Sequence, residues 1–214
     1  MTHRTRVKIC GITRIEDALY AAQCGTDSIG LNFHPASPRC LDIDQASAIR
    51  DAVPPFVNIT ALFMDEDDDW IARVVHQLRP DCLQFHGSES SELCASWSIP
   101  YIKTIPMGSV ANPAEYVASY PDAQGFLLDS HAAGRQGGSG DTFDWARYPS
   151  QLDCPLILAG GITAENATDA IVQTRPWGVD VSSGVESEKG IKSRGLIDAF
   201  INAVNQGDAA IREE

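Results

Sequence analysis

The first residues able to do chemistry lie in the segment V-K-I-C-G-I-T, residues 7–13. Its apolar and β-branched residues predict a short strand that brings Cys10 to its carboxyl end, where Gly11 allows a sharp turn. Side chains alternate along a strand, so Lys8 and Cys10 share one face. A cation beside a thiol favours the thiolate, which is the nucleophilic and basic form. The alternative is a buried cysteine that only packs.

An acid partner for this thiol is predicted at the end of a later strand. Asp129 follows Leu127 by two residues and ends an apolar segment, so it is expected to point into the same opening as Leu127. A carboxyl group there is costly to desolvate, which favours its protonated form and a role as general acid. The alternative is a turn or cap residue.

Two later strand ends predict a phosphate site. Backbone N–H groups of glycine-rich turns and short helical turns can hold a phosphate dianion, and barrel enzymes often bind phosphate after strands seven and eight. The alternative is that the glycines only turn the chain. The residues expected to bind phosphate are Gly160, Gly161, Ser182, Ser183 and Gly184.

Three other features suit a binding site. Arg39 follows Pro38 in a loop and could bind a carboxylate in a bidentate manner, although a solvated arginine is equally consistent. His86 ends the segment Q-F-H-G, where a structural, hydrogen-bonded histidine is the alternative to a substrate-binding one. The glycines of residues 134–141 predict either a lid that excludes water or a passive linker.

The elements that must position these residues alternate between strand and helix. Eight such units predict right-handed crossovers and a parallel sheet that closes into a single-domain (β/α)8 TIM barrel. An open doubly wound sheet is disfavoured, because no G-x-G-x-x-G follows the first strand. The expected strands are residues 7–10, 28–33, 57–64, 82–86, 101–105, 126–129, 156–159 and 178–181, and the last helix is expected over 190–204.

Length and charge limit the possible functions. The chain of 214 residues, 43% hydrophobic, suits one barrel domain over residues 1–205, followed by a polar tail over 206–214 that we expect to be frayed. The net charge of −13 disfavours binding to nucleic acid or to an anionic membrane, because both need clustered lysine and arginine. No apolar run reaches the ~18 residues of a membrane span.

The six cysteines indicate a reducing compartment. They show no C-x-x-C pair and no metal-finger spacing, and the N-terminus has no apolar segment typical of a secretory signal. We therefore expect a cytoplasmic protein.

Several segments together resemble the phosphoribosylanthranilate isomerase family of tryptophan biosynthesis. They are K-I-C-G-I-T, S-P-R, Q-F-H-G, L-L-D-S followed by G-G-S-G-D-T-F-D-W, L-A-G-G-I and V-D-V-S-S-G-V-E, and they occur in order between Val7 and about Asn205. The resemblance implies an Amadori rearrangement that requires neither cofactor nor metal. The substrate would be a small phosphorylated molecule, and the protein a monomer or a homodimer.

The resemblance also implies individual roles. Asp129 would be the general acid and Cys10 the general base, while Arg39 would hold the anthranilate carboxylate. His86 and Asp180 would contact substrate, with less certain roles. The chain departs from the family pattern at Asp141 and over residues 189–193, where K-G-I-K-S replaces a segment that usually ends in Asp.

Three alternatives stay open at this point. Another phosphosugar isomerase or epimerase barrel would need clustered metal ligands at strand ends. A flavin-binding barrel would give a yellow protein. A noncatalytic binder of phosphorylated ligands would show saturable binding without turnover.

Overall fold

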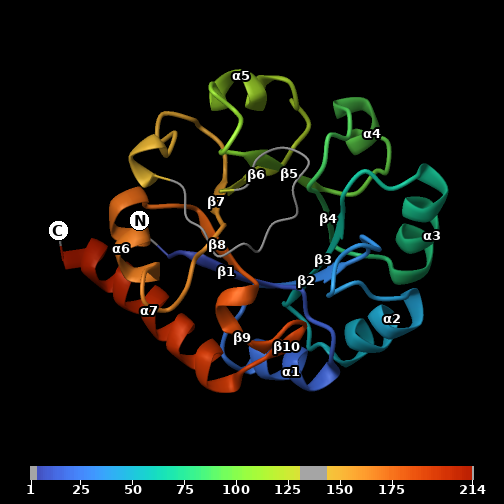
Figure 1. Cartoon of the computed structure of the whole chain (residues 1–214), viewed down its shortest axis with the longest axis horizontal. Helices are drawn as coiled ribbons and strands as arrows, with labels where there is room; N and C mark the ends of the chain where they lie inside the picture. Colours follow the sequence, from blue (N-terminus) through green and yellow to red (C-terminus); the bar gives the residue numbers. More distant parts are fainter. Residues whose placement is uncertain (1–3, 131–143, 214) are drawn as a thin grey trace.

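The computed structural model describes residues 4–130 and 144–213 and has a closed barrel of parallel strands in chain order (Figure 1). Each strand pairs with the next, and β8 pairs with β1 to close the ring. The expected single (β/α)8 barrel is therefore confirmed. The barrel strands are β1 (Arg6–Cys10), β2 (Ser28–Asn32), β3 (Asn58–Phe63), β4 (Cys82–Phe85), β5 (Tyr101–Pro106), β6 (Gly125–Asp129), β7 (Leu156–Leu158) and β8 (Gly178–Val181).

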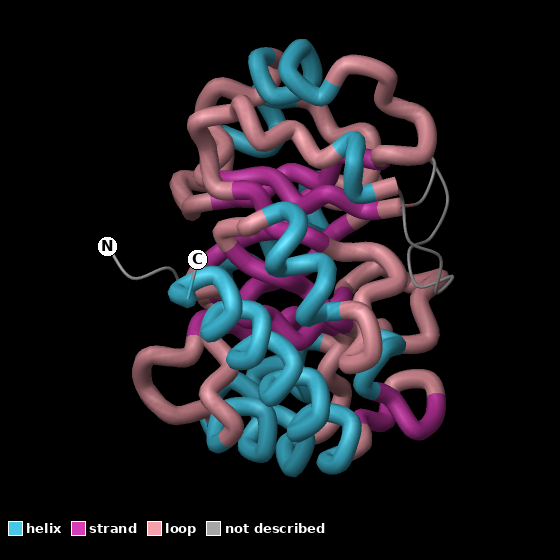
Figure 2. The backbone as a smooth tube through the Cα atoms, turned by 90° about the vertical axis from the view of Figure 1, so that its left-hand side faces the viewer, coloured by secondary structure: helices cyan, strands magenta, loops and turns pink. Residues whose placement is uncertain are grey.

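The helices lie outside the strands (Figure 2). In the described part of the β6–β7 connection, a 3-10 turn, η1 (Trp145–Arg147), replaces the helix expected over 144–148. After β8, a second 3-10 turn, η2 (Ser183–Val185), leads into a hairpin of β9 (Glu186–Glu188) and β10 (Ile191–Lys192). The α-helices are α1 (Ile15–Gln23), α2 (Ile43–Ala52), α3 (Asp68–Leu78), α4 (Ser91–Ala95), α5 (Pro113–Ala118), α6 (Ala167–Thr174) and α7 (Arg194–Glu213).

Local sequence explains most helix starts. Asp42 caps α2, since its carboxylate accepts from the backbone of Gln45, whose side chain accepts in return. Thr13 does not cap α1, because its hydroxyl donates to the carbonyl of Gly190 instead. Arg14 occupies the N-cap without a side-chain cap hydrogen bond. Thr13 thus joins the β1–α1 loop to the β9–β10 hairpin.

The barrel interior contains a small apolar cluster and several buried polar side chains. The main core lies between the strands and the helices, while a small separate cluster of Ile102, Leu127, Ile157 and Ala159 fills the interior along β5, β6 and β7. Buried polar residues occupy β1, β4 and β8, among them Lys8, Gln84 and Asp180. Among the described residues, no helix is long and apolar enough to cross a membrane.

The expected frayed tail over 206–214 is wrong, because residues 206–213 form the last part of α7. Gly207 is buried and packs against Ile171 of α6, where a Cβ atom would lie 2.9 Å from the isoleucine side chain. Asp208 is also buried, and its carboxylate accepts from both the backbone N–H and the hydroxyl of Thr5, at 2.9 and 2.7 Å. The polar composition of this segment did not indicate that one face of the helix packs against the rest of the protein.

We expect the substitution Asp208→Ala to destabilise the fold. It leaves two buried donors of Thr5 without their acceptor, which typically costs about 1–3 kcal/mol of unfolding free energy. Urea denaturation followed by circular dichroism measures this cost. Gln206→Ala, on the exposed face of the same helix, is the matched control. Equal stability of the two variants would contradict the packed C-terminus.

Candidate functional site

One cavity lies at the carboxyl ends of the strands and brings together most of the residues singled out from the sequence. Its volume is about 100 Å³. Cys10 ends β1 and Asp129 ends β6, and both line it, as strand alternation predicted. The lining residues are Cys10, Gly11, Asn32, His34, Ser37, Pro38, Arg39, Leu62, Met64, Gln84, His86, Asp129, Asp180 and Ser182. A thiol and a carboxyl group therefore face one space from different strands.

Lys8 and Asp180 form a buried ion pair below the thiol. The register of β1 and β8 places these two residues directly opposite each other, and Nζ lies 2.9 Å from the carboxylate. Gly30 on β2 makes room for this arrangement, because a Cβ there would lie 2.7 Å from the Cys10 sulfur and 3.0 Å from Nζ of Lys8. Burial disfavours the charge on Lys8, but Asp180 and Cys10 outweigh it and raise its pKa above the ordinary value.

Lys8 lies beside Cys10 as expected and lowers the pKa of the thiol, but burial acts in the opposite direction and outweighs it. The sulfur is in a cysteine that is only 6% exposed, and this burial raises the pKa of the thiol above its ordinary value. Lys8 and Lys192 act in the opposite direction, whereas Asp180 adds to the increase. Because the charge of Lys8 is largely committed to Asp180, it offsets burial only in part. The pKa of Cys10 is therefore raised in this structure despite the nearby cations.

Arg39 lies on the cavity wall, but its guanidinium group is already engaged. Nε and Nη2 each lie 2.7 Å from a carboxylate oxygen of Glu186, which is the bidentate geometry typical of arginine and carboxylate. Lys192 on β10 contacts the same carboxylate at 2.8 Å and the carbonyl of Ser182 at 3.0 Å. The hairpin after β8 thus holds Arg39 in position beside Cys10.

His86 connects the carboxyl group of Asp129 to β4 and β5. Its Nε2 lies 3.6 Å from Oδ2 of Asp129, while Nδ1 lies 3.0 Å from the hydroxyl of Thr104 and 3.2 Å from the side-chain nitrogen of Gln84. If Gln84 donates to Nδ1, the proton of a neutral ring is on Nε2 and faces Asp129. The arrangement fixes which edge of the imidazole meets the carboxyl group.

The two loops expected to bind phosphate lie side by side. Gly184, in η2, packs so closely on the β7–α6 loop that a Cβ would lie 2.3 Å from the carbonyl of Ile162. Gly160 and Gly161 both have positive φ, and Ser183 begins η2 as the sequence suggested. Of the five expected phosphate residues, only Ser182 is on the wall of the cavity.

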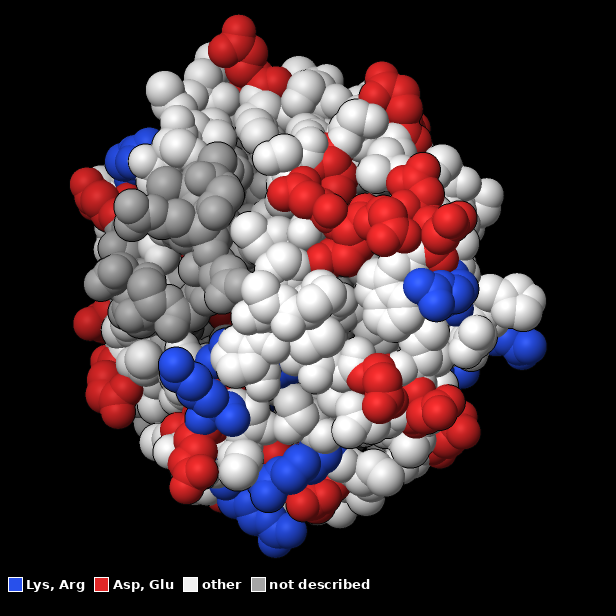
Figure 3. Space-filling model, turned by 45° about the vertical axis from the view of Figure 1, so that its right-hand side comes forward, with Lys and Arg blue, Asp and Glu red and all other residues white. Residues whose placement is uncertain are grey.

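The surface charge gives no attraction for an anionic ligand on the face shown in Figure 3. Acidic side chains gather there over a broad area, and lysine and arginine form separate smaller groups. Four of the five acidic residues in 65–69 are exposed. Positive charge near the cavity comes from Arg39 on its wall and from Lys8 and Lys192 close to it, and these three side chains are held by Asp180 and Glu186.

Two features lie outside this site or outside the described residues. The possible lid over 134–141, including Asp141, falls in the segment that the structure does not describe. Within residues 4–130 and 144–213, no group of three or more His, Cys, Asp or Glu side chains is arranged to hold a metal ion.

A second cavity, of about 350 Å³, lies at the opposite end of the barrel and is lined by residues such as Arg6, Cys82 and Trp177.

Sequence reasoning missed Glu186, Lys192 and Gly30. Glu186 and Lys192 lie far from Arg39 along the chain, and only the hairpin brings them together. The available signals were the segment V-D-V-S-S-G-V-E, which ends in Glu186, and the unusual segment 189–193, which contains Lys192. Gly30 could have been found from its position, since a glycine in the middle of a strand often marks a close approach of another group.

A sequence model of the N-(5'phosphoribosyl)anthranilate (PRA) isomerase family matches residues 7–203 of the chain. The chain is 51% identical over 205 residues to N-(5'-phosphoribosyl)anthranilate isomerase of Halorhodospira halophila, covering 96% of this chain and 99% of the relative. It is 46% identical over 212 residues to the enzyme of the same name from Xanthomonas euvesicatoria, covering 96% of both.

Solved structures agree with these sequence matches. Phosphoribosyl anthranilate isomerase from Thermotoga maritima superimposes with a TM-score of 0.83 at 36% identity, covering 94% of this chain and 98% of that chain. A crystal structure of the same kind of enzyme in complex with reduced 1-(o-carboxyphenylamino)-1-deoxyribulose 5-phosphate gives a TM-score of 0.81 at 35% identity, with the same coverage.

We expect Cys10 to ionise only above the pH at which a free cysteine does, because its pKa is raised by burial. The ultraviolet absorbance of thiolate, recorded against pH as the difference between the protein and Cys10→Ser, reports this residue alone. Lys8→Met removes the nearby cation and leaves Asp180 uncompensated, so ionisation moves to still higher pH. A transition below the ordinary cysteine pKa of about 8.5 would contradict the assignment.

Proposed function

Because the chain belongs to the N-(5'-phosphoribosyl)anthranilate isomerase family, we propose that it performs the family's Amadori rearrangement in tryptophan biosynthesis. The substrate is N-(5'-phosphoribosyl)anthranilate and the product is 1-(2-carboxyphenylamino)-1-deoxyribulose 5-phosphate. The observation that supports the proposal most directly is that Cys10, Asp129 and Arg39 line one cavity at the carboxyl ends of the strands. A relative with the reduced product bound supports the same substrate class.

In the proposed mechanism, Asp129 is the general acid. It protonates the furanose ring oxygen, the bond from that oxygen to C1 breaks, and the anomeric carbon becomes an iminium group conjugated to the anthranilate nitrogen. His86 lies beside the carboxyl group and fixes its orientation. General acids in this position typically contribute about 10²- to 10⁴-fold to the rate.

Cys10 is the general base for the second step. As a thiolate it removes the proton from C2, and the electron pair of that bond neutralises the iminium group to give an enolamine, which tautomerises to the ketose. Burial raises the pKa of the thiol, and an iminium cation next to C2 stabilises the thiolate by direct Coulomb attraction as the thiol proton passes to solvent. Lys8, held by Asp180, adds a fixed positive charge below the sulfur.

The two anionic ends of the substrate are assigned to different parts of the cavity. Arg39 takes the anthranilate carboxylate through Nη1, since Nε and Nη2 are bound to Glu186. The phosphate is assigned to Gly160, Gly161, Ser182, Ser183 and Gly184, whose two loops pack together. The first N–H groups of a 3-10 turn have no partner within that turn and suit an anion.

The remaining expectations stay predictions. We propose that the reaction needs no cofactor and no metal, that it takes place in the cytoplasm, and that the partner of the protein is a small phosphorylated substrate, with nucleic acid excluded by charge. The protein is a monomer or a homodimer. A phosphoribosyl anthranilate isomerase of T. maritima is described as dimeric. Light scattering tests whether this protein is also a homodimer.

A fluorescence assay tests the reaction itself. Freshly prepared phosphoribosylanthranilate should lose its fluorescence at a rate proportional to the protein added, with the next pathway enzyme present to remove product. Cys10→Ala and Asp129→Asn should each lower kcat by about 10²- to 10⁴-fold while circular dichroism stays unchanged. Cys82→Ala, a cysteine of the barrel that lines the opposite cavity, is the control. Near-normal turnover of either site variant would refute its role.

Arg39→Ala should raise KM and leave kcat within about threefold, because an interaction made equally in ground state and transition state affects binding alone. Steady-state kinetics over a range of substrate concentrations separates the two constants. Arg73→Ala removes the same charge from an exposed position on α3 and should change neither. An unchanged KM in Arg39→Ala would place the carboxylate elsewhere.

A further inference from the structure

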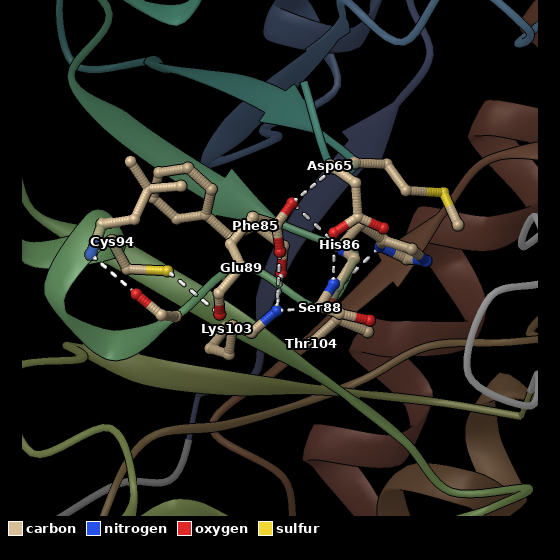
Figure 4. Close-up of polar contacts among 12 residues, drawn as sticks. Asp65, Phe85, His86, Ser88, Glu89, Cys94, Lys103 and Thr104 are labelled. Atoms are coloured by element: carbon tan, nitrogen blue, oxygen red, sulfur yellow. Dashed lines mark hydrogen bonds and ion pairs between the residues drawn. The ribbon is translucent and has the colours of Figure 1, made fainter. Parts of the chain in front are cut away.

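Glu89 and Lys103 form an ion pair in the layer between the barrel and its helices (Figure 4). Lys103 is 0% exposed and Glu89 is 4% exposed, and Nζ lies 2.8 Å from Oε2. An aromatic ring lies close to the pair, since Nζ of Lys103 is 5.4 Å from the ring centre of Tyr120. Taking two charges out of water costs several kcal/mol per ion, and a well-packed apolar pair is often as stable. Stability alone therefore does not explain why charges lie there.

The hydrogen bonds of Lys103 centre on one residue, His86. Nζ contacts the carbonyl of Phe85 at 3.4 Å and that of Gly87 at 2.5 Å, which are the carbonyl groups on either side of His86 in sequence. The next residue on β5, Thr104, points to the opposite face of the strand, and its hydroxyl lies 3.0 Å from Nδ1 of the histidine ring. Neighbouring residues of β5 thus hold the backbone of His86 from outside the barrel and its ring from inside.

Glu89 holds the same loop through its other carboxylate oxygen. Oε1 accepts from the backbone N–H of Asp65 at 2.9 Å and from that of Gly87 at 3.3 Å. Asp65 in turn accepts from the backbone of Ser88 at 2.6 Å. The carboxylate therefore joins the β3–α3 loop to the β4–α4 loop. Figure 4 shows these contacts meeting beneath His86.

We propose that Lys103 and Glu89 are positioning residues that keep His86 in place against Asp129. The inference rests on the proposed function, since it takes Asp129 as the acid of the reaction. His86 Nε2 is 3.6 Å from the carboxyl group, so a shift of the loop by one ångström changes that contact directly. Displacements of this size in an active site can lower rates by about 10²-fold. Neither residue lines the cavity.

The design of the test must separate positioning from folding. Either single apolar substitution leaves an uncompensated buried charge and is expected to destabilise the protein. The double variant Lys103→Met with Glu89→Leu removes both charges at similar volume and is expected to keep more stability than either single variant. Glu89→Gln is a milder second variant, because it keeps the size of the side chain and the oxygen that accepts from Asp65 and Gly87.

In the fluorescence assay, the double variant should lose about 10- to 100-fold in kcat with KM within about threefold, because Arg39 and the residues assigned to the phosphate are untouched. The pH profile of kcat should also shift, since the carboxyl group of Asp129 loses its fixed neighbour. Glu89→Gln should show the same pH shift with a smaller loss of kcat. Asp208→Ala, which removes buried hydrogen bonds far from the cavity, should lower the Tm but leave kcat and the pH profile unchanged.

The outcomes are distinct. Wild-type kcat and pH profile in the double variant, or in a folded Glu89→Gln should the double variant fail to fold, would overturn the positioning role and leave the proposed function intact. A loss of kcat that follows Tm equally in Asp208→Ala would also overturn it, since folding would then be the whole effect. Absence of turnover in the unmodified protein would overturn the proposed function first and this inference with it.

Discussion

Several buried charges in the described part of this barrel are matched by an opposite charge at hydrogen-bonding distance. Lys8 meets Asp180 across the β1–β8 seam, while Lys192 shares the carboxylate of Glu186 with Arg39. An unpaired ion in such a place would cost several kcal/mol, so each pair constrains the strands and loops that carry it. The shape of the cavity therefore depends on electrostatic neutrality as well as on packing.

The same constraint affects the ionisation of Cys10. A cation that is already bound to a carboxylate stabilises a nearby anion only weakly, so the pKa of the thiol stays raised unless another positive charge lies beside it. Under the proposed mechanism, the substrate itself supplies that charge when its ring opens. The base is thus activated by the intermediate on which it acts, and an empty site holds little thiolate to be oxidised.

Local patterns predicted the barrel and the strand-end residues, and long-range contacts were beyond them. Alternation along a strand is a property of neighbouring residues, which is why Cys10 and Asp129 were placed on the cavity correctly. The bond between Arg39 and Glu186 joins residues far apart in sequence, and no local signal reports it. For residues 206–213 the composition led to the wrong prediction of a frayed tail. A helix that packs through only one face is otherwise polar, so its overall composition is the same as that of a tail.

The pairing of the first strand with the last also affects how the protein folds while it is being synthesised. β1 acquires one of its two neighbours only when β8 exists, and Thr5 is capped by a carboxylate within the last ten residues of the sequence. A ribosome releases the chain from its N-terminus, so β1 must wait with an open edge until β8 has been synthesised. The ring therefore closes only after all eight strands are available, and nascent chains are exposed to aggregation until it does.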